Sequence, residues 1–143
     1  MTSFEAQVGT WAAKVPGAID AVRKGAAQDV VGEMQTPRGA GGHMRVRTGF
    51  LWNSLMASTS RMPSINPEYR PPSDASPGSY SYSAADIELV ILGSDITDPL
   101  YFGYTAAYAG IREYRDGFIR LAAQNWQQHV AENVRRVRSA LKV

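Results

Sequence analysis

Side chains that can transfer protons or hold metal ions are few in this chain of 143 residues. The histidines are His43, in a glycine-rich stretch, and His129, in a helical pattern near the C-terminus. Neither has a nucleophile at a catalytic spacing in the sequence, although a triad can also be assembled from distant residues. The chain has no cysteine, no His-x-x-x-His pair and no Glu-x-x-His pair that would place two metal ligands on one helical face. The sequence therefore predicts no cofactor, no metal site and no enzymatic activity.

Asp86 and Glu88 form the most regular pair of carboxylates. They lie in a run of branched apolar residues, Asp86 to Gly93, which predicts a β-strand. Residues two apart on a strand point to the same face, so the pair could hold a divalent cation or serve in glycoside hydrolysis. We favour a simpler interpretation, in which the two acids mark the solvent face of the strand or the side that meets a basic partner.

Charges of opposite sign concentrate in different parts of the chain. Residues 74–98 contain five carboxylates and no basic residue, whereas residues 112–142 contain seven basic residues and three acidic ones. Such a chain could bind a polyanion through one face, or it could stack on copies of itself, acidic edge to basic edge. The candidate contact residues are Asp86, Glu88, Arg135, Arg136 and Arg138. Arginines near the end of a helix also suit the helix dipole, which is the simpler explanation for them.

Length and hydropathy predict a single domain over residues 1–143. No apolar stretch approaches the roughly 18 residues that a membrane-spanning helix needs, and the first residues do not resemble a secretory signal. Apolar residues spaced three and four apart predict helices over residues 4–15, 16–35 and 118–141, with Pro16 dividing the first two.

The rest of the chain predicts a small sheet and long loops. Parts of residues 44–60 and 84–96 are expected to supply antiparallel strands. Residues 38–45 are rich in glycine and predict a flexible segment, and residues 61–83 contain five prolines and predict a long irregular loop. The predicted fold class is α+β, with N-terminal helices and a long C-terminal helix packed on a small antiparallel β-sheet.

Residues 46–55, named here the turn segment, are the most informative stretch. Gly49 can adopt the positive φ of a tight turn, and Thr48 can hydrogen-bond the turn backbone. Leu51 and Leu55 can then anchor the following residues in the core. The pattern leaves open whether those residues form a strand or one helical turn.

Thr36-Pro37 and, after an insertion over Gly39 to Arg45, the turn segment together resemble the Thr-Pro-Val-x-Thr-Gly-x-Leu-x-x-Ser signature of a family of neck and tail-completion proteins of long-tailed bacteriophages. Two later elements, residues 107–114 and 118–122, look like that family's Tyr-Ala-x-x-x-Glu-aromatic element and the start of its last helix. The order and spacing agree over about residues 4–141. The residues that carry the resemblance are Val46, Thr48, Gly49, Leu51, Ser54, Tyr108, Glu113 and Phe118.

The resemblance implies a structural virion protein, made in the cytoplasm of a bacterial host. Its copies would form a hexameric or dodecameric ring at the head-tail junction, between the head connector or stopper and the tail-tube protein. DNA would pass through the bore without sequence-specific binding, and no membrane would be involved. The alternatives are a tail terminator that caps the tail tube, a small DNA-binding module that uses the basic C-terminal helix and, most remote, a hydrolase that uses His129 or the Asp86/Glu88 pair.

Overall fold

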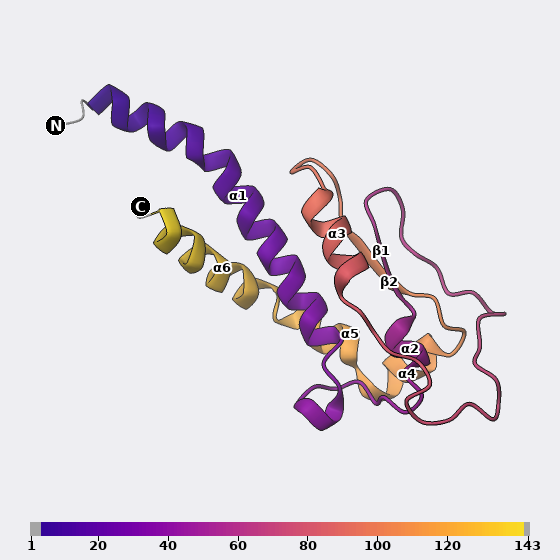
Figure 1. Cartoon of the computed structure of the whole chain (residues 1–143). Coiled ribbons are helices and arrows are strands. Elements are labelled where there is room, and N and C mark those ends of the chain that lie inside the picture. The colour runs from indigo at the N-terminus through magenta and orange to yellow at the C-terminus, as the bar shows by residue number, and fades with distance from the viewer. Residues whose placement is uncertain (1–3, 142–143) are drawn as a thin grey trace.

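The computed structural model describes the backbone of residues 4–141 and the side chains of residues 17–141. Helices and a two-stranded sheet alternate along the chain, which confirms the predicted α+β class (Figure 1). The elements, in chain order, are α1 (Phe4–Met34), the 3-10 helix η1 (Arg38–Ala40), α2 (Phe50–Asn53), β1 (Leu55–Ser58), α3 (Ala85–Gly93), β2 (Tyr101–Tyr104), α4 (Ala109–Asp116), α5 (Phe118–Gln124) and α6 (Trp126–Leu141).

The long helices α1 and α6 run side by side in opposite directions, and both chain ends lie at the far end of this pair (Figure 1). The shorter elements gather around the C-terminal end of α1. Helix α3 packs against α1 and β1, and α5 packs against α1. Among the described helices, none is both long enough and apolar enough to cross a membrane.

The N-terminal region is one continuous helix, so the predicted division of residues 4–35 into two helices is wrong. Proline removes one backbone hydrogen bond from a helix interior, but its fixed φ is itself helical. The chain therefore continues through Pro16 as helix α1. The side chains of residues 4–15, from which the first helix was predicted, lie outside the described set.

Residues 85–93 form helix α3, so the predicted β-strand is wrong. Ile87 and Ile91, four residues apart, are buried, whereas Leu89 between them is 70% exposed. On a strand all three would share one face, but on a helix only residues three or four apart do so. The acids in the first turn also favour a helix, because negative charge there complements the helix dipole.

The sheet consists of β1 and β2, paired antiparallel with Leu55 opposite Tyr104 and Ser58 opposite Tyr101. The first strand lies within the predicted range 44–60, but the second follows the predicted range 84–96 instead of lying inside it. Because residues 85–93 are helical, the partner strand is drawn from the aromatic segment further along the chain.

The predicted helix over residues 118–141 is divided at Asn125 into α5 and α6. The side-chain amide of Asn125 donates hydrogen bonds to both carboxylate oxygens of Glu33 on α1, at 2.9 and 3.1 Å. This contact with a distant part of the chain holds the junction of α5 and α6 against α1.

The two segments predicted to be irregular are both tied to the body. In residues 38–45, the Arg38 amide donates to the Met44 carbonyl at 2.8 Å, and the Met44 side chain is fully buried. Residues 61–83 form no helix or strand, as predicted. The backbone amide of Asn66 in this loop nevertheless donates to the Thr105 carbonyl at 2.9 Å.

Among the described side chains, one hydrophobic core joins helices α1 to α5 and the sheet. Its buried members include Val31 and Met34 of α1, Ile91 of α3 and Phe118 of α5. Gln35 completes the core at the end of α1: its amide nitrogen donates to the Trp52 carbonyl at 2.8 Å and its amide oxygen accepts from the Tyr104 hydroxyl at 2.5 Å. Buried polar groups need such partners, so these bonds fix α1 relative to the sheet.

Candidate assembly interface

The turn segment is built as its residue types predict. Gly49 has a φ of 87°, and the Thr48 hydroxyl accepts a hydrogen bond from the Phe50 amide at 3.2 Å. A Cβ on Gly49 would lie 1.9 Å from the Tyr80 carbonyl oxygen. The Tyr80 amide donates to the Thr48 carbonyl at 2.8 Å. Gly49 is therefore required both for its backbone conformation and for the close approach of the proline-rich loop.

The sequence left open whether the residues after the turn form a strand or one helical turn. They form one helical turn, α2, followed directly by β1. Leu51 and Leu55 are both buried, which confirms their predicted anchoring role. The Ser54 hydroxyl donates to the Leu51 carbonyl at 2.8 Å, and the Ser54 carbonyl accepts from the Thr105 amide at 3.1 Å. Val46, in contrast, is 36% exposed and lies outside the core.

Glu113 joins two consecutive helices. Its carboxylate accepts hydrogen bonds from the backbone amides of Ile119 at 2.8 Å and Arg120 at 3.1 Å, at the start of α5. The first amides of a helix have no partner within it, so a carboxylate placed there stabilises the helix. Gly117 turns the chain between α4 and α5 with a φ of 69°.

Tyr108 and Phe118 belong to the packed interior of the same region. The Tyr108 ring stacks on Phe50 with centroids 6.2 Å apart, and burial raises the pKa of its phenol. Phe118 is fully buried and meets Tyr104 edge to face at 5.0 Å. Apart from the exposed Val46, the residues that carry the resemblance therefore occupy turn, cap and core positions.

The acidic candidate residues lie on the outer side of α3. Asp86 and Glu88 are both exposed, but positions i and i+2 of a helix are separated by about 200°. The two acids therefore lie at the two edges of the exposed side of α3 and do not point the same way, as the predicted strand would have placed them. Leu89 and Leu92 on the same helix are 70% and 58% exposed. Helix α3 thus presents leucines flanked by carboxylates; Leu89, Leu92, Asp86 and Glu88 are named here the α3 face.

The basic candidate residues lie on α6 and are all exposed. Arg136 turns toward α1, where its guanidinium lies 3.3 Å from a carboxylate oxygen of Asp29. Arg135 and Arg138 are three residues apart and share a side of the helix. The three arginines therefore differ in role. Arg136 pairs with Asp29 of the same chain, whereas Arg135 and Arg138 form no ion pair within the described part of the chain.

The α3 face and the α6 arginines lie on different sides of α1. Helix α1 contacts both helices, and in Figure 1 it passes between them. The acidic and basic surfaces therefore do not neutralise each other within one chain. A third surface, on α4, exposes Ile111 at 60% and Tyr114 at 83%.

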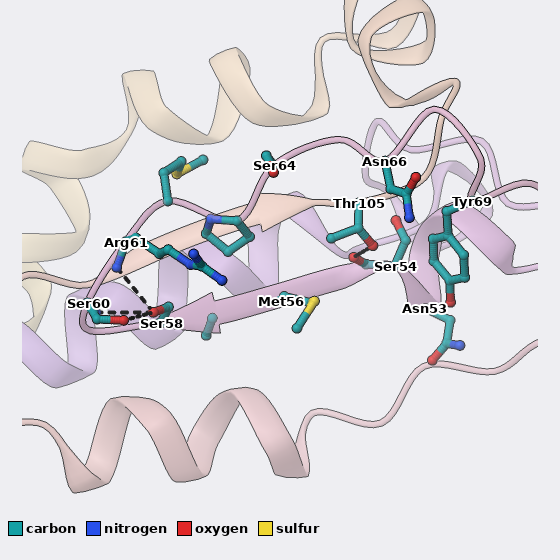
Figure 2. Close-up of a pocket in the computed structure, with 13 residues that line it drawn as sticks. Asn53, Ser54, Met56, Ser58, Ser60, Arg61, Ser64, Asn66, Tyr69 and Thr105 are labelled. Carbon is teal, nitrogen blue, oxygen red and sulfur yellow. Dashed lines mark hydrogen bonds between the residues drawn. The ribbon is translucent and has the colours of Figure 1, made fainter.

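An open hollow of about 790 Å³ lies between β1 and the start of the proline-rich loop. Figure 2 shows its polar lining, which includes Ser54, Ser58 and Ser60. The Ser58 hydroxyl accepts hydrogen bonds from the amides of Ser60 and Arg61, at 3.1 and 3.3 Å. No carboxylate or imidazole is among the residues that line this hollow, so its hydroxyls have no adjacent general base.

The two histidines occupy different environments. His43 is exposed in the segment between η1 and α2, whereas His129 lies between α6 and α1 with its side chain 14% exposed. Asp29 and Glu132 lie beside His129. His129 and Glu132 are spaced His-x-x-Glu, the reverse of the Glu-x-x-His order expected of a helical metal site. Asp29 lies a hundred residues away in the sequence and reaches this pair only through the packing of α1 on α6.

No family model, no curated protein and no solved structure matched this chain.

Proposed function

We propose that this protein is a structural component of a phage neck or tail end, whose copies form a closed ring between the head connector and the tail tube. The observation that carries the proposal is the placement of an acidic, apolar α3 face and of two α6 arginines, which form no ion pair with the described side chains, on different sides of α1. The resemblance of the turn segment, of residues 107–114 and of residues 118–122 supplies the biological setting.

A ring requires two different patches on each copy. When one patch meets the other on the next copy, the contact repeats, and it closes if the rotation between copies divides a full turn. The α3 face and the α6 arginines are complementary in charge and are not the same surface. Complementary potentials steer such contacts and set their orientation.

Burial of exposed apolar side chains would supply the favourable free energy of association, to which the charged residues contribute little. Leu89 and Leu92 are more than half exposed, and covering them on assembly would remove apolar surface from water at about 25 cal/mol per Å². A specific interface buries about 800 Å² on each partner, which is a small part of the 9145 Å² that one chain exposes.

The positions of the resemblance residues agree with a structural role. Seven of the eight form the turn, the α5 cap and the core, where they maintain a shape rather than face a substrate. The loop over residues 61–83, tied to the body near Asn66 and Tyr80, exposes most of its length and is the segment that would reach an adjacent connector, stopper or tail-tube protein.

A charge exchange tests the proposed contact. Native mass spectrometry of the full chain should show a hexamer or dodecamer. The double change Arg135→Glu with Arg138→Glu should weaken association about tenfold or more, because facing like charges cost several kcal/mol. Asp86→Lys with Glu88→Lys should do the same. Arg136 is left unchanged because its substitution would also break the ion pair with Asp29.

Combining both double changes should restore the ring, since each pair of charges is again opposite. Arg70→Glu, in the exposed loop, is the control for net charge and should leave assembly unchanged. Assembly that survives each double change, or that is lost equally in the control, would show that this contact does not form the ring.

The DNA-binding alternative predicts a different dependence on salt. Binding of the basic helix to phosphates should fall steeply as salt increases, in proportion to the number of contacts. A ring component that only surrounds DNA need show no affinity as a monomer. In the structure, one of the three arginines already pairs with Asp29, and Glu132 lies on the same helix, which leaves a small basic surface for DNA.

A further inference from the structure

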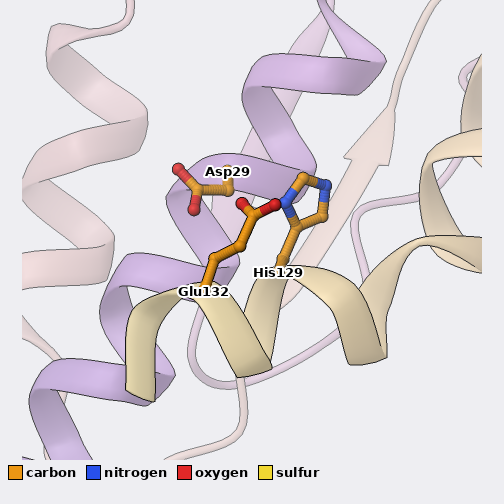
Figure 3. Close-up of side chains that lie close together, drawn as sticks. All are labelled: Asp29, His129 and Glu132. Carbon is orange, nitrogen blue, oxygen red and sulfur yellow. The ribbon is translucent and has the colours of Figure 1, made fainter. Parts of the chain in front are cut away.

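The contact between α1 and α6 contains a cluster of metal-ligating side chains. Asp29 of α1 and His129 and Glu132 of α6 bring one nitrogen and two carboxylate oxygens within 4.8 Å of one another. In Figure 3 the Glu132 carboxylate lies between Asp29 and the His129 imidazole. The two helices thus contribute ligands from opposite sides to a single point.

His129 is the member of the cluster that makes no side-chain hydrogen bond within the described part of the chain. Both ring nitrogens have less than 1 Å² of exposed surface and neither makes a hydrogen bond. The nearest carboxylate oxygen, of Glu33, is 3.4 Å from Nε2. Buried polar atoms are satisfied in nearly all native structures, so a buried imidazole with two unused nitrogens indicates a missing partner.

We propose that this cluster is a divalent-cation site of the zinc type that bridges α1 and α6. The imidazole of His129 and the carboxylates of Asp29 and Glu132 are the ligands, and a water completes four-coordination. Zinc accepts this mixture of nitrogen and oxygen donors at about 2.0–2.2 Å. Calcium and magnesium prefer sites made of oxygen alone, so the imidazole favours a transition metal or zinc.

The spacing on each helix suits such a site. His129 and Glu132 are three residues apart on α6, and Asp29 and Glu33 are four apart on α1, so each pair shares one helical face. Tetrahedral ligands around zinc lie about 3.4 Å from one another, given the bond lengths above. The observed separations of up to 4.8 Å therefore require only small side-chain rotations to close.

The surroundings orient one ligand. Asp29 Oδ2 accepts a hydrogen bond from the Asn133 amide at 2.8 Å and lies 3.3 Å from the Arg136 guanidinium. Partners of this kind commonly hold ligating carboxylates in place. The charge of Arg136 opposes that of a cation, but the carboxylates of Asp29, Glu132 and Glu33 all lie near the imidazole.

Bound metal would link α1 to α6 and stabilise the folded chain by RT ln(1 + c/Kd), where c is the metal concentration, so stability would rise with the logarithm of the metal concentration above Kd. The site lies within one chain, so it is independent of ring formation. We propose metal binding at this site and no reaction. Its effect is that the stability of the α1–α6 contact depends on the metal concentration of the solution.

The test uses the full chain, without a histidine tag and stripped of metal with chelator. Zinc chloride is titrated calorimetrically, and Co²⁺ is added in parallel to observe the visible absorption of a tetrahedral cobalt site. We expect one ion per chain and a rise in the thermal midpoint. His129→Ala and Glu132→Gln should each weaken binding about tenfold or more.

His43→Ala is the matched control, because it removes the other histidine of the chain from an exposed loop. It should bind zinc like the parent chain. Glu132→Gln keeps the size and shape of the side chain, so it remains informative if His129→Ala fails to fold. Absence of saturable binding by the parent chain would overturn the proposal, as would binding that is lost with His43 and retained without His129.

Discussion

Gly25 of α1 lies directly against Asn133 of α6. A Cβ on Gly25 would be 2.0 Å from the Asn133 side-chain oxygen, and Asn133 is itself 4% exposed. The Asn133 amide nitrogen is held by Asp29 and by the His129 carbonyl, each at 2.8 Å. The side chain therefore has little freedom to move, and the helices approach closely at this point because position 25 carries no side chain.

Gly25→Ala should destabilise the folded chain by about 1–3 kcal/mol, as overpacking of a filled contact does. Gly17→Ala on the same helix is the control, since nothing lies within 4 Å of a Cβ there. That change should stabilise the chain by about 0.5–1 kcal/mol, because alanine loses less entropy in a helix. Urea unfolding of both variants measures the difference. Equal behaviour of the two would mean that the helices are not in contact at Gly25.

Gly49→Ala should destabilise the chain more than Gly41→Ala. Both glycines have positive φ, 87° and 95°, so each change costs about 1–2 kcal/mol for the backbone alone. A Cβ at Gly49 also meets the Tyr80 carbonyl at 1.9 Å, whereas Gly41 faces open space. The additional cost should be about 1–3 kcal/mol. Chemical denaturation of the two variants isolates this contact, and identical losses would refute it.

The Tyr104 hydroxyl should make stability depend on alkaline pH. Burial, with smaller contributions from the nearby Tyr82 and Glu113, raises the pKa of Tyr104 well above its usual value of 10. Above about pH 10 the unfolded chain releases this proton while the folded chain retains it, so the free energy of unfolding falls by up to about 1.4 kcal/mol per pH unit.

Tyr104→Phe should reduce this alkaline slope, and at neutral pH it should cost about 1–3 kcal/mol because Gln35 loses its buried donor. Denaturation at pH 7 to 11 measures both effects. Tyr101→Phe, on the same strand, is the control and should preserve the slope. A slope unchanged by Tyr104→Phe would show that the hydroxyl is not buried as described.

The sequence predicted the elements that depend on local chemistry. The positive φ of Gly49 and the Thr48 hydrogen bond require only a few neighbouring residues, and both were confirmed. The amphipathic character of α6 was also visible in its spacing. These features are local, so no knowledge of the rest of the fold was needed.

The predictions from sequence were wrong or incomplete where contacts between distant residues determine the structure. The run of branched residues at 86–93 favours a strand by propensity, but it forms a helix that packs against α1 and β1 and buries Ile87 and Ile91. Likewise the last helix divides at Asn125, whose side chain bonds to the distant Glu33 on α1. The cluster of Asp29 with His129 and Glu132 also depends on the pairing of α1 with α6. Such contacts cannot be read from one segment.

The most direct test of ring assembly uses the absence of cysteine from the native chain. Asp86→Cys and Arg135→Cys are introduced together and joined with a bismaleimide cross-linker, and the products are separated by size under denaturing conditions. If the α3 face meets α6 of the next copy, the products form a ladder of whole monomers that ends at a hexamer or dodecamer, while each single-cysteine variant stops at a dimer. Products no larger than those of the single variants would contradict a closed ring built through this contact.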